Sequence, residues 1–132
     1  MTLSGERDYG LDHKRGIFES PVADRLVQGR MTVYVEYAQR PDGTWSGGCY
    51  LRSQSANWVS RPAMSGDALS GPYSSETKCR EAVAAYLIKR IRREIIDFDG
   101  DVVTDDERRY ARRMVEKLQE YCNSLRQTSL AL

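Results

Sequence analysis

The stretch MTVYVEYAQRPDGTWSGGCYLR, residues 31–52, alternates apolar and polar side chains on both sides of a turn sequence. Alternation with a period of two is typical of a strand that buries one face. We therefore predict one strand over residues 31–38 and a second over residues 44–52. Between them, Pro41 presets the backbone for a turn, and Asp42-Gly43 tolerates its left-handed position.

Two features surround this predicted hairpin. Gly47 and Gly48 interrupt the second strand, which is typical of a bulge or of a close approach by another backbone. A third, short strand is predicted around residues 56–60, and a further edge strand near Ala68 would make the sheet four-stranded. The antiparallel arrangement follows from the short connections.

After residue 75 the apolar spacing changes to three and four residues, which predicts two helices. The first begins at Ser74 or Ser75, and its buried stripe is Cys79, Ala82, Val83, Tyr86, Leu87, Ile91 and Ile95. The second runs from Thr104 to about Arg126, with a stripe of Tyr110, Ala111, Met114, Leu118, Tyr121, Cys122 and Leu125. Residues 104–107, Thr-Asp-Asp-Glu, have the form of a capping box at its start.

The N-terminal part of the chain gives weaker signals. Ser20-Pro21 has the form of a helix start, and Val22 and Leu26 would share one face of a short helix over residues 21–28 that Gly29 ends. Residues 1–19 show no period and are expected to form a flexible arm.

These patterns together predict an α+β fold. A three-stranded, possibly four-stranded, antiparallel sheet would carry an antiparallel two-helix hairpin on one face, in the order β-β-β-α-α after the possible short helix. We expect one domain over residues 20–126 and a frayed C-terminus over residues 127–132.

Composition limits the possible functions. The chain has 132 residues, a formal net charge of +1 and a hydrophobic fraction of 40%, which is typical of one globular domain without a strong overall field. Cys49, Cys79 and Cys122 show no zinc or redox spacing and are expected to be buried thiols in a reducing compartment. With no apolar segment of a secretory signal near the N-terminus, we expect a cytoplasmic protein.

No arrangement of residues indicates catalysis. The single histidine, His13, lies in the polar N-terminal stretch, so neither a Ser-His-Asp nor a Cys-His site can be assigned. Asp97, Asp99 and Asp101 have the spacing of a calcium loop, but Arg108 occupies the position that needs a glutamate. We therefore expect a non-enzyme without a metal or cofactor, in which these acidic residues serve the start of the second helix.

The leading functional hypothesis is a protein-interaction module. The sheet face opposite the apolar stripe carries four candidate protein contacts, Tyr34, Glu36, Tyr50 and Arg52. A tyrosine pair flanked by charges is typical of a contact surface, and equally of a cross-strand pair that only supports the sheet. An open sheet face or a sheet edge could hold the partner.

The alternative hypothesis is a nucleic-acid-binding or antitoxin-like regulator. Its candidate contacts are two basic clusters that an antiparallel helix pair would bring to one end, Lys89, Arg90, Arg93, Arg108, Arg109, Arg112 and Arg113. The intervening acidic residues could instead neutralise both clusters, which we favour because the chain lacks excess positive charge. The sequence leaves oligomeric state open.

Partial resemblances accompany these patterns. Gly71-Pro72-Tyr73-Ser74-Ser75 followed by Glu81-Ala82 resembles the helix entry of small uncharacterised proteobacterial domains with a sheet and a packed helix, which implies a bacterial origin. With a helix over residues 21–28, the order also resembles the double-stranded-RNA-binding fold, whose lysine-rich helix start holds phosphates; the matching positions here offer Lys78 and Arg80 beside Glu76 and Thr77. HicB-type antitoxins share a β-β-β-α core and usually add a DNA-binding element.

Overall fold

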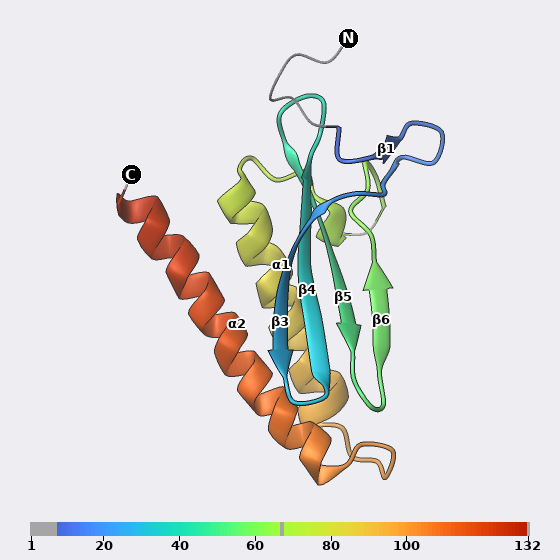
Figure 1. The fold of residues 1–132 in the computed structure, drawn as a ribbon, viewed down its shortest axis with the longest axis vertical. Coiled ribbons are helices and arrows are strands. Elements are labelled where there is room, and N and C mark those ends of the chain that lie inside the picture. The colour runs from blue at the N-terminus through green and yellow to red at the C-terminus, as the bar shows by residue number, and fades with distance from the viewer. Residues whose placement is uncertain (1–7, 67, 132) are drawn as a thin grey trace.

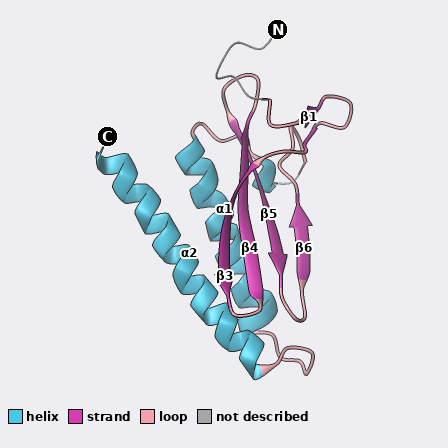
Figure 2. Cartoon of the chain, in the orientation of Figure 1, coloured by secondary structure: helices cyan, strands magenta, loops and turns pink. Residues whose placement is uncertain are grey.

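The computed structural model describes residues 8–66 and 68–131 and has an α+β fold (Figures 1 and 2). Its strands are β1 (Leu11–Asp12), β2 (Ile17–Phe18), β3 (Val22–Gln28), β4 (Met31–Gln39), β5 (Trp45–Arg52) and β6 (Asn57–Ser60). Its helices are α1 (Glu76–Ile91) and α2 (Asp105–Ala131), with a 3-10 turn at Ala68–Ser70 and a π-helical turn at Arg92–Ile96 that continues α1. The predicted fold class is confirmed.

Strands β3 to β6 form one antiparallel sheet in chain order, and β1 and β2 pair separately. Alternate residues of the central strand β4 are buried, because Met31, Val33, Val35 and Tyr37 face the helices. In the view of Figure 1 the sheet lies in front of α1, so both helices cover one face of the sheet and leave the other bare. The three strands predicted over residues 31–60 are present at nearly the expected bounds.

The predicted helix over residues 21–28 is wrong, because this stretch is strand β3. It pairs with β4 along its whole length, from Val22 opposite Tyr37 to Gln28 opposite Met31. Gly29 has a φ of +60°, which suits the first position of a two-residue hairpin turn of type II′. The fourth strand of the sheet is therefore β3, whereas the chain at Ala68 forms a 3-10 turn instead of the predicted edge strand.

Both long helices begin with the predicted caps. The Ser75 side chain accepts a hydrogen bond from the backbone N–H of Lys78, and the Thr104 hydroxyl accepts one from the N–H of Glu107 at 3.1 Å. The Glu107 carboxylate does not complete a capping box. It is 2% exposed, and one of its oxygens accepts hydrogen bonds from Ser53 and Ser55 in the loop between β5 and β6. Glu107 thus joins the start of α2 to the sheet.

The N-terminal segment, predicted as an arm over residues 1–19, lies partly outside the described residues. From residue 8 onward it folds back on itself through β1 and β2, and Phe18 is fully buried. The Phe18 N–H donates to the carbonyl of Pro62, which joins this hairpin to the chain after β6. At the other end, α2 continues to Ala131, beyond the expected end near Arg126.

The core lies between the sheet and the two helices. It contains Leu87 from α1 and Leu118 from α2, both fully buried, and the three cysteines are buried free thiols. Burial raises the pKa of Cys79 to about 12, so this thiol stays protonated at neutral pH. Tyr86 was predicted in the core and is instead 36% exposed, because it lies at the edge of the buried stripe of α1. Its hydroxyl accepts a hydrogen bond from Arg90.

The tandem glycines of β5 face two crowded surfaces. A Cβ atom at Gly47 would lie 2.6 Å from a methyl group of Val83 in α1. One at Gly48 would lie 2.4 Å from the carbonyl oxygen of Ser60 and 2.6 Å from the nitrogen of Pro62. Pairing with β4 continues through both glycines without a bulge. Of the two predicted explanations, a bulge and a close approach by another backbone, the close approach is therefore correct.

A polar cluster ties β3 to both helices. Asp24 accepts hydrogen bonds from Arg80 of α1 at 2.9 Å, from Tyr121 of α2 at 2.6 Å and from Tyr37 of β4 at 3.2 Å. The Arg80 guanidinium also lies over both tyrosine rings. Because four elements meet at this carboxylate, it fixes the edge strand to the helical layer.

Candidate functional site

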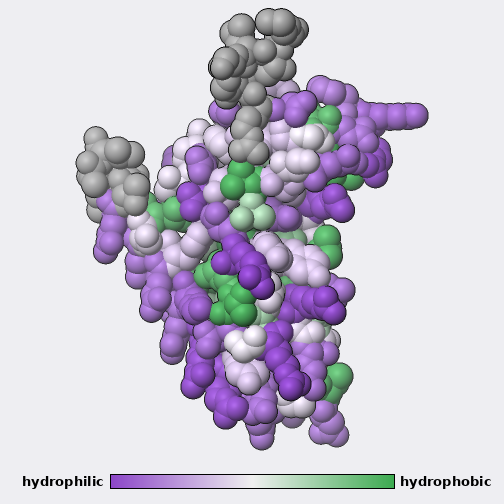
Figure 3. Space-filling model, viewed as in Figure 1, coloured by the Kyte–Doolittle hydropathy of each residue, from purple (hydrophilic) through white to green (hydrophobic). Residues whose placement is uncertain are grey.

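The bare face of the sheet carries all four predicted protein contacts. Tyr34 and Tyr50 lie directly opposite each other on β4 and β5, with ring centroids 5.7 Å apart and an angle of 62° between the rings. This edge-to-face geometry is a favourable arrangement for aromatic pairs. Figure 3, which views this face, shows a few green apolar patches among pale and purple hydrophilic side chains.

A hollow of about 510 Å³ opens beside the tyrosine pair. It forms because the cross-strand neighbours of Glu36 are Ala23 and Gly48, whose side chains are too small to fill the surface. The chain at Pro21 bounds it on one side and Arg61 on another. Its full lining is Phe18, Glu19, Pro21, Ala23, Tyr34, Glu36, Tyr50, Val59 and Arg61.

Glu36 lies within this hollow and is partly buried. Burial raises the pKa of its carboxyl group above the ordinary value, and the positive charge of Arg61 opposes that shift. No hydrogen bond or ion pair holds Glu36 among the described residues. The hollow therefore offers a carboxylate, a guanidinium and two phenol rings to whatever enters it.

Arg52 shares the face but does not line the hollow. It pairs with Thr32 and Asn57, one row beyond the tyrosines. Conversely, sequence reasoning missed Pro21, Val59 and Arg61. Val59 is 60% exposed next to Tyr50, and its outward position could have been found from the alternation in residues 57–60.

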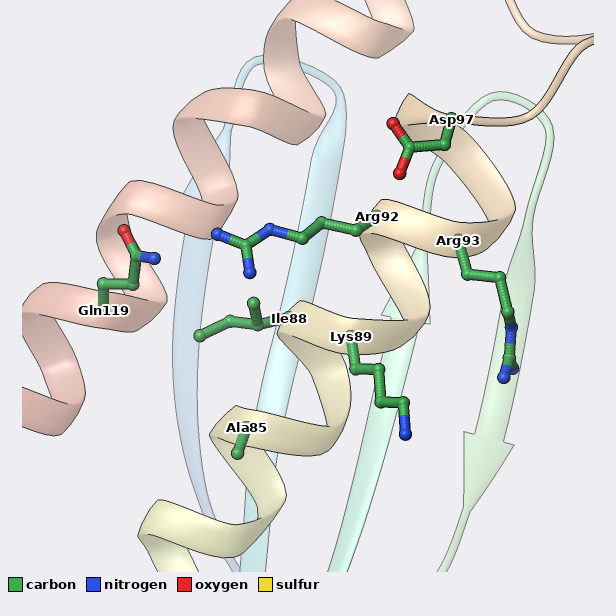
Figure 4. Close-up of a pocket in the computed structure, with 7 residues that line it drawn as sticks. All are labelled: Ala85, Ile88, Lys89, Arg92, Arg93, Asp97 and Gln119. Carbon is green, nitrogen blue, oxygen red and sulfur yellow. The ribbon is translucent and has the colours of Figure 1, made fainter.

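The basic residues of the alternative hypothesis do not form one cluster. Lys89, Arg92 and Arg93 line a groove beside α2, where Arg92 extends toward α2 and the side chains of Lys89 and Arg93 project to the side of α1 away from α2 (Figure 4). Arg90 stacks on Trp58 at 4.2 Å. Arg90 also pairs with Glu94.

In α2, Arg108 and Arg109 are paired with Asp105 and Asp106. Arg108 also donates to the carbonyl groups of Phe98 and Gly100 in the connection between the helices. Arg112 and Arg113 are exposed and make no ion pair with another described residue. The first turn of α2 thus pairs two of the four arginines of this predicted cluster, while the other predicted cluster is divided between two surfaces.

Chemistry elsewhere in the described chain is sparse. His13 is exposed in the turn between β1 and β2. In residues 8–66 and 68–131, no group of three or more His, Cys, Asp or Glu side chains is placed to hold a metal ion. Within the same residues, neither helix has the length and apolar character needed to cross a membrane.

Comparison of the chain with known protein families, curated proteins and solved structures finds no match. The geometry of its surfaces is therefore the basis for inferring its function. The double-stranded-RNA-binding order requires a helix before the sheet, and the described chain has strand β3 at that place.

Proposed function

We propose that this protein is a non-catalytic interaction module that binds a partner protein on the bare face of its sheet. The observation that carries the proposal is the hollow around Glu36, bounded by Tyr34 and Tyr50. Tyrosine is enriched among residues that dominate binding energy, because its large ring loses little conformational freedom and its hydroxyl still hydrogen-bonds.

The surroundings of the hollow support the same function. Val59 adds an exposed apolar side chain, and Arg25 and Arg52 lie in neighbouring positions with no ion pair to another described residue. An aromatic and apolar centre with a charged rim is the usual composition of a protein interface. A side chain of the partner would enter the hollow, and its flanking residues would cover the rim.

The test is affinity capture from the native cell with three forms of the protein: the parent, Tyr34→Ala/Tyr50→Ala, and Tyr86→Ala. Tyr86 is an exposed tyrosine on the helical side and serves as the matched control. We expect the double variant to lose a partner that the parent and the control retain, since each hot-spot tyrosine contributes about 2 kcal/mol.

A photo-crosslinking residue at position 59 would show whether the same partner touches the hollow directly. Retention of every parent partner by a folded double variant would refute the proposal. Unchanged circular dichroism and melting temperature would establish that the double variant is folded.

The alternative function, nucleic-acid binding by the helix ends, has weaker support. Arg108 and Arg109 already have carboxylate partners, and Arg90 lies against Trp58. A nucleic-acid site would be recognised by steep salt dependence and by loss of binding in Arg109→Glu/Arg113→Glu. We further propose a cytoplasmic location, which the three buried free thiols support.

A further inference from the structure

A second candidate site lies on the outer side of the helical layer, away from the bare sheet face. The groove between α1 and α2 has a volume of about 740 Å³. Ala85 and Ile88 of α1 form its apolar floor, and Gln119 of α2 supplies an amide. Of the charged lining residues Lys89, Arg92, Arg93 and Asp97, Arg92 extends toward α2, and Lys89 and Arg93 project along the opposite flank of α1 (Figure 4).

The positive charges of the groove are largely uncompensated. Lys89 and Arg92 make no ion pair with another described residue. Arg93 is 67% exposed and only reaches Glu94 at 3.8 Å, and Glu94 is already held by Arg90. With Asp97 as the one carboxylate in the lining, the groove has an excess of two positive charges.

The lining residues form two adjacent stripes along α1 and the π-helical turn that continues it. Ala85, Ile88 and Arg92 follow the helical spacing of three and four, and Lys89 and Arg93 lie one position further round. From Ala85 to Asp97 the groove extends about 18 Å at 1.5 Å per residue. An ion pair between Glu81 and Arg126 closes the seam beyond its far end.

The π-helical turn Arg92–Ile96 lies at the other end of the groove. There the N–H of Asp97 donates to the carbonyl of Arg92 at 2.8 Å, across five residues. Such turns are rare and occur frequently at functional sites. This turn provides two of the three basic side chains, so the least regular part of the helical layer coincides with its basic groove.

We propose that this groove binds an acidic amphipathic helix of a partner protein. Apolar side chains of that helix would pack on Ala85 and Ile88, and its carboxylates would pair with Lys89, Arg92 and Arg93. A single nucleic-acid strand suits the groove less well, because the lining contains no aromatic ring for base stacking and Asp97 would repel phosphate.

The probe is a synthetic peptide of about 14 residues, which covers the groove at 1.5 Å per residue. Leucine forms one stripe, and glutamates flank it. A second peptide carries lysine in place of glutamate, and a third probe is single-stranded oligothymidylate. Fluorescence anisotropy should show binding of the acidic peptide and about tenfold weaker binding, or none, of the lysine peptide and the oligonucleotide.

Three variants locate the site. Lys89→Glu/Arg92→Glu should weaken binding of the acidic peptide about tenfold or more, whereas Lys14→Glu/Arg113→Glu makes the same charge change outside the groove and should leave it within about twofold. Ile88→Gln keeps the charge and should also weaken binding, which a purely electrostatic attraction would not predict.

The proposal is overturned by any of four results: equal binding of the two peptides, equal loss in the control variant, no binding of the acidic peptide up to about 1 mM, or tighter binding of the oligonucleotide that the groove reversal abolishes. Since none of these variants touches the bare sheet face, such a failure leaves the proposed function in place.

Discussion

The carboxylate of Asp24 offers the sharpest test of how this fold is held together. We consider Asp24→Leu, Arg80→Met and the double variant that combines them. In each single variant one partner of a mostly buried ion pair is left behind. In the double variant both charges are replaced by apolar side chains of similar size.

The structure sets the expected magnitudes. The two side chains are 29% and 22% exposed, and Asp24 accepts three hydrogen bonds. Hydrogen bonds to a buried charged group contribute about 1.5–3 kcal/mol each. Because Asp24 and Arg80 are partly exposed, we expect each hydrogen bond of Asp24 to contribute less than the low end of that range. We expect Asp24→Leu to lower the free energy of unfolding by about 3 kcal/mol and Arg80→Met by about 2 kcal/mol.

The double variant should lose only about 3 kcal/mol, because Glu76, which loses its pairing with Arg80, is 43% exposed and no buried charge is left unpaired. The coupling energy is then about 2 kcal/mol. Urea unfolding followed by circular dichroism measures all four proteins, and thermal melting should fall by about 12 °C in Asp24→Leu. The exposed pair Asp106 and Arg109 provides a control cycle, with a coupling below about 1 kcal/mol.

Additive single effects in the Asp24–Arg80 cycle would refute this account. They would mean that the cluster contributes no pairwise energy and that β3 is held to the helices by apolar contacts alone. A coupling in the control as large as that in the cluster would contradict a different part of this account, because burial would then not strengthen the pair.

Two further predictions concern Tyr37 and Gly48. Burial raises the pKa of Tyr37 to about 12, so its neutral phenol contributes stability that is fully present below the unfolded pKa of about 10 and is lost as pH rises to about 12. The loss is about 3 kcal/mol at most, and the free energy of unfolding measured in urea should change less across this pH range in Tyr37→Phe. An equal slope in the two proteins would contradict the assignment. In Gly48→Ala the new methyl group would meet the backbone at Ser60 and Pro62. We expect the free energy of unfolding to fall by about 3 kcal/mol. An unchanged urea midpoint would show that the chain after β6 does not cross this glycine.

Where local pattern and tertiary pairing agreed, the sequence was sufficient to predict the fold. Strand β4 alternates over its whole length, and the starts of α1 and α2 carry side chains that cap them. These signals depend on neighbouring residues alone, so no knowledge of the rest of the chain is needed to read them.

The failure at residues 21–28 has a specific cause. Val22 and Leu26 match a helix at a spacing of four, and Val22, Asp24 and Leu26 match a strand at a spacing of two. Seven residues are too few to distinguish the helical period from the strand period. The pair Ser20-Pro21, which has the form of a helix start, therefore favoured the helix. Pairing with β4 decides the conformation, and only the three-dimensional structure contains that information.

The candidate site was predictable in part. Alternation along β4 and β5 places Tyr34, Glu36 and Tyr50 on one face, and the turn between the strands sets the tyrosines opposite each other. The hollow was not predictable, because its walls come from the chain at Pro21 and Arg61, which reach the sheet face only through folding of the N-terminal hairpin and the segment after β6.

The tandem glycines of β5 set the distance between the layers of this protein. At Gly47 and Gly48 the sheet is one peptide backbone thick, with the helical layer in contact on one side and the chain that borders the hollow on the other. Neither glycine adds a side chain of its own to these contacts. Because Gly47 and Gly48 share one peptide unit, a larger residue at either position would push α1 or the chain after β6 away from the sheet.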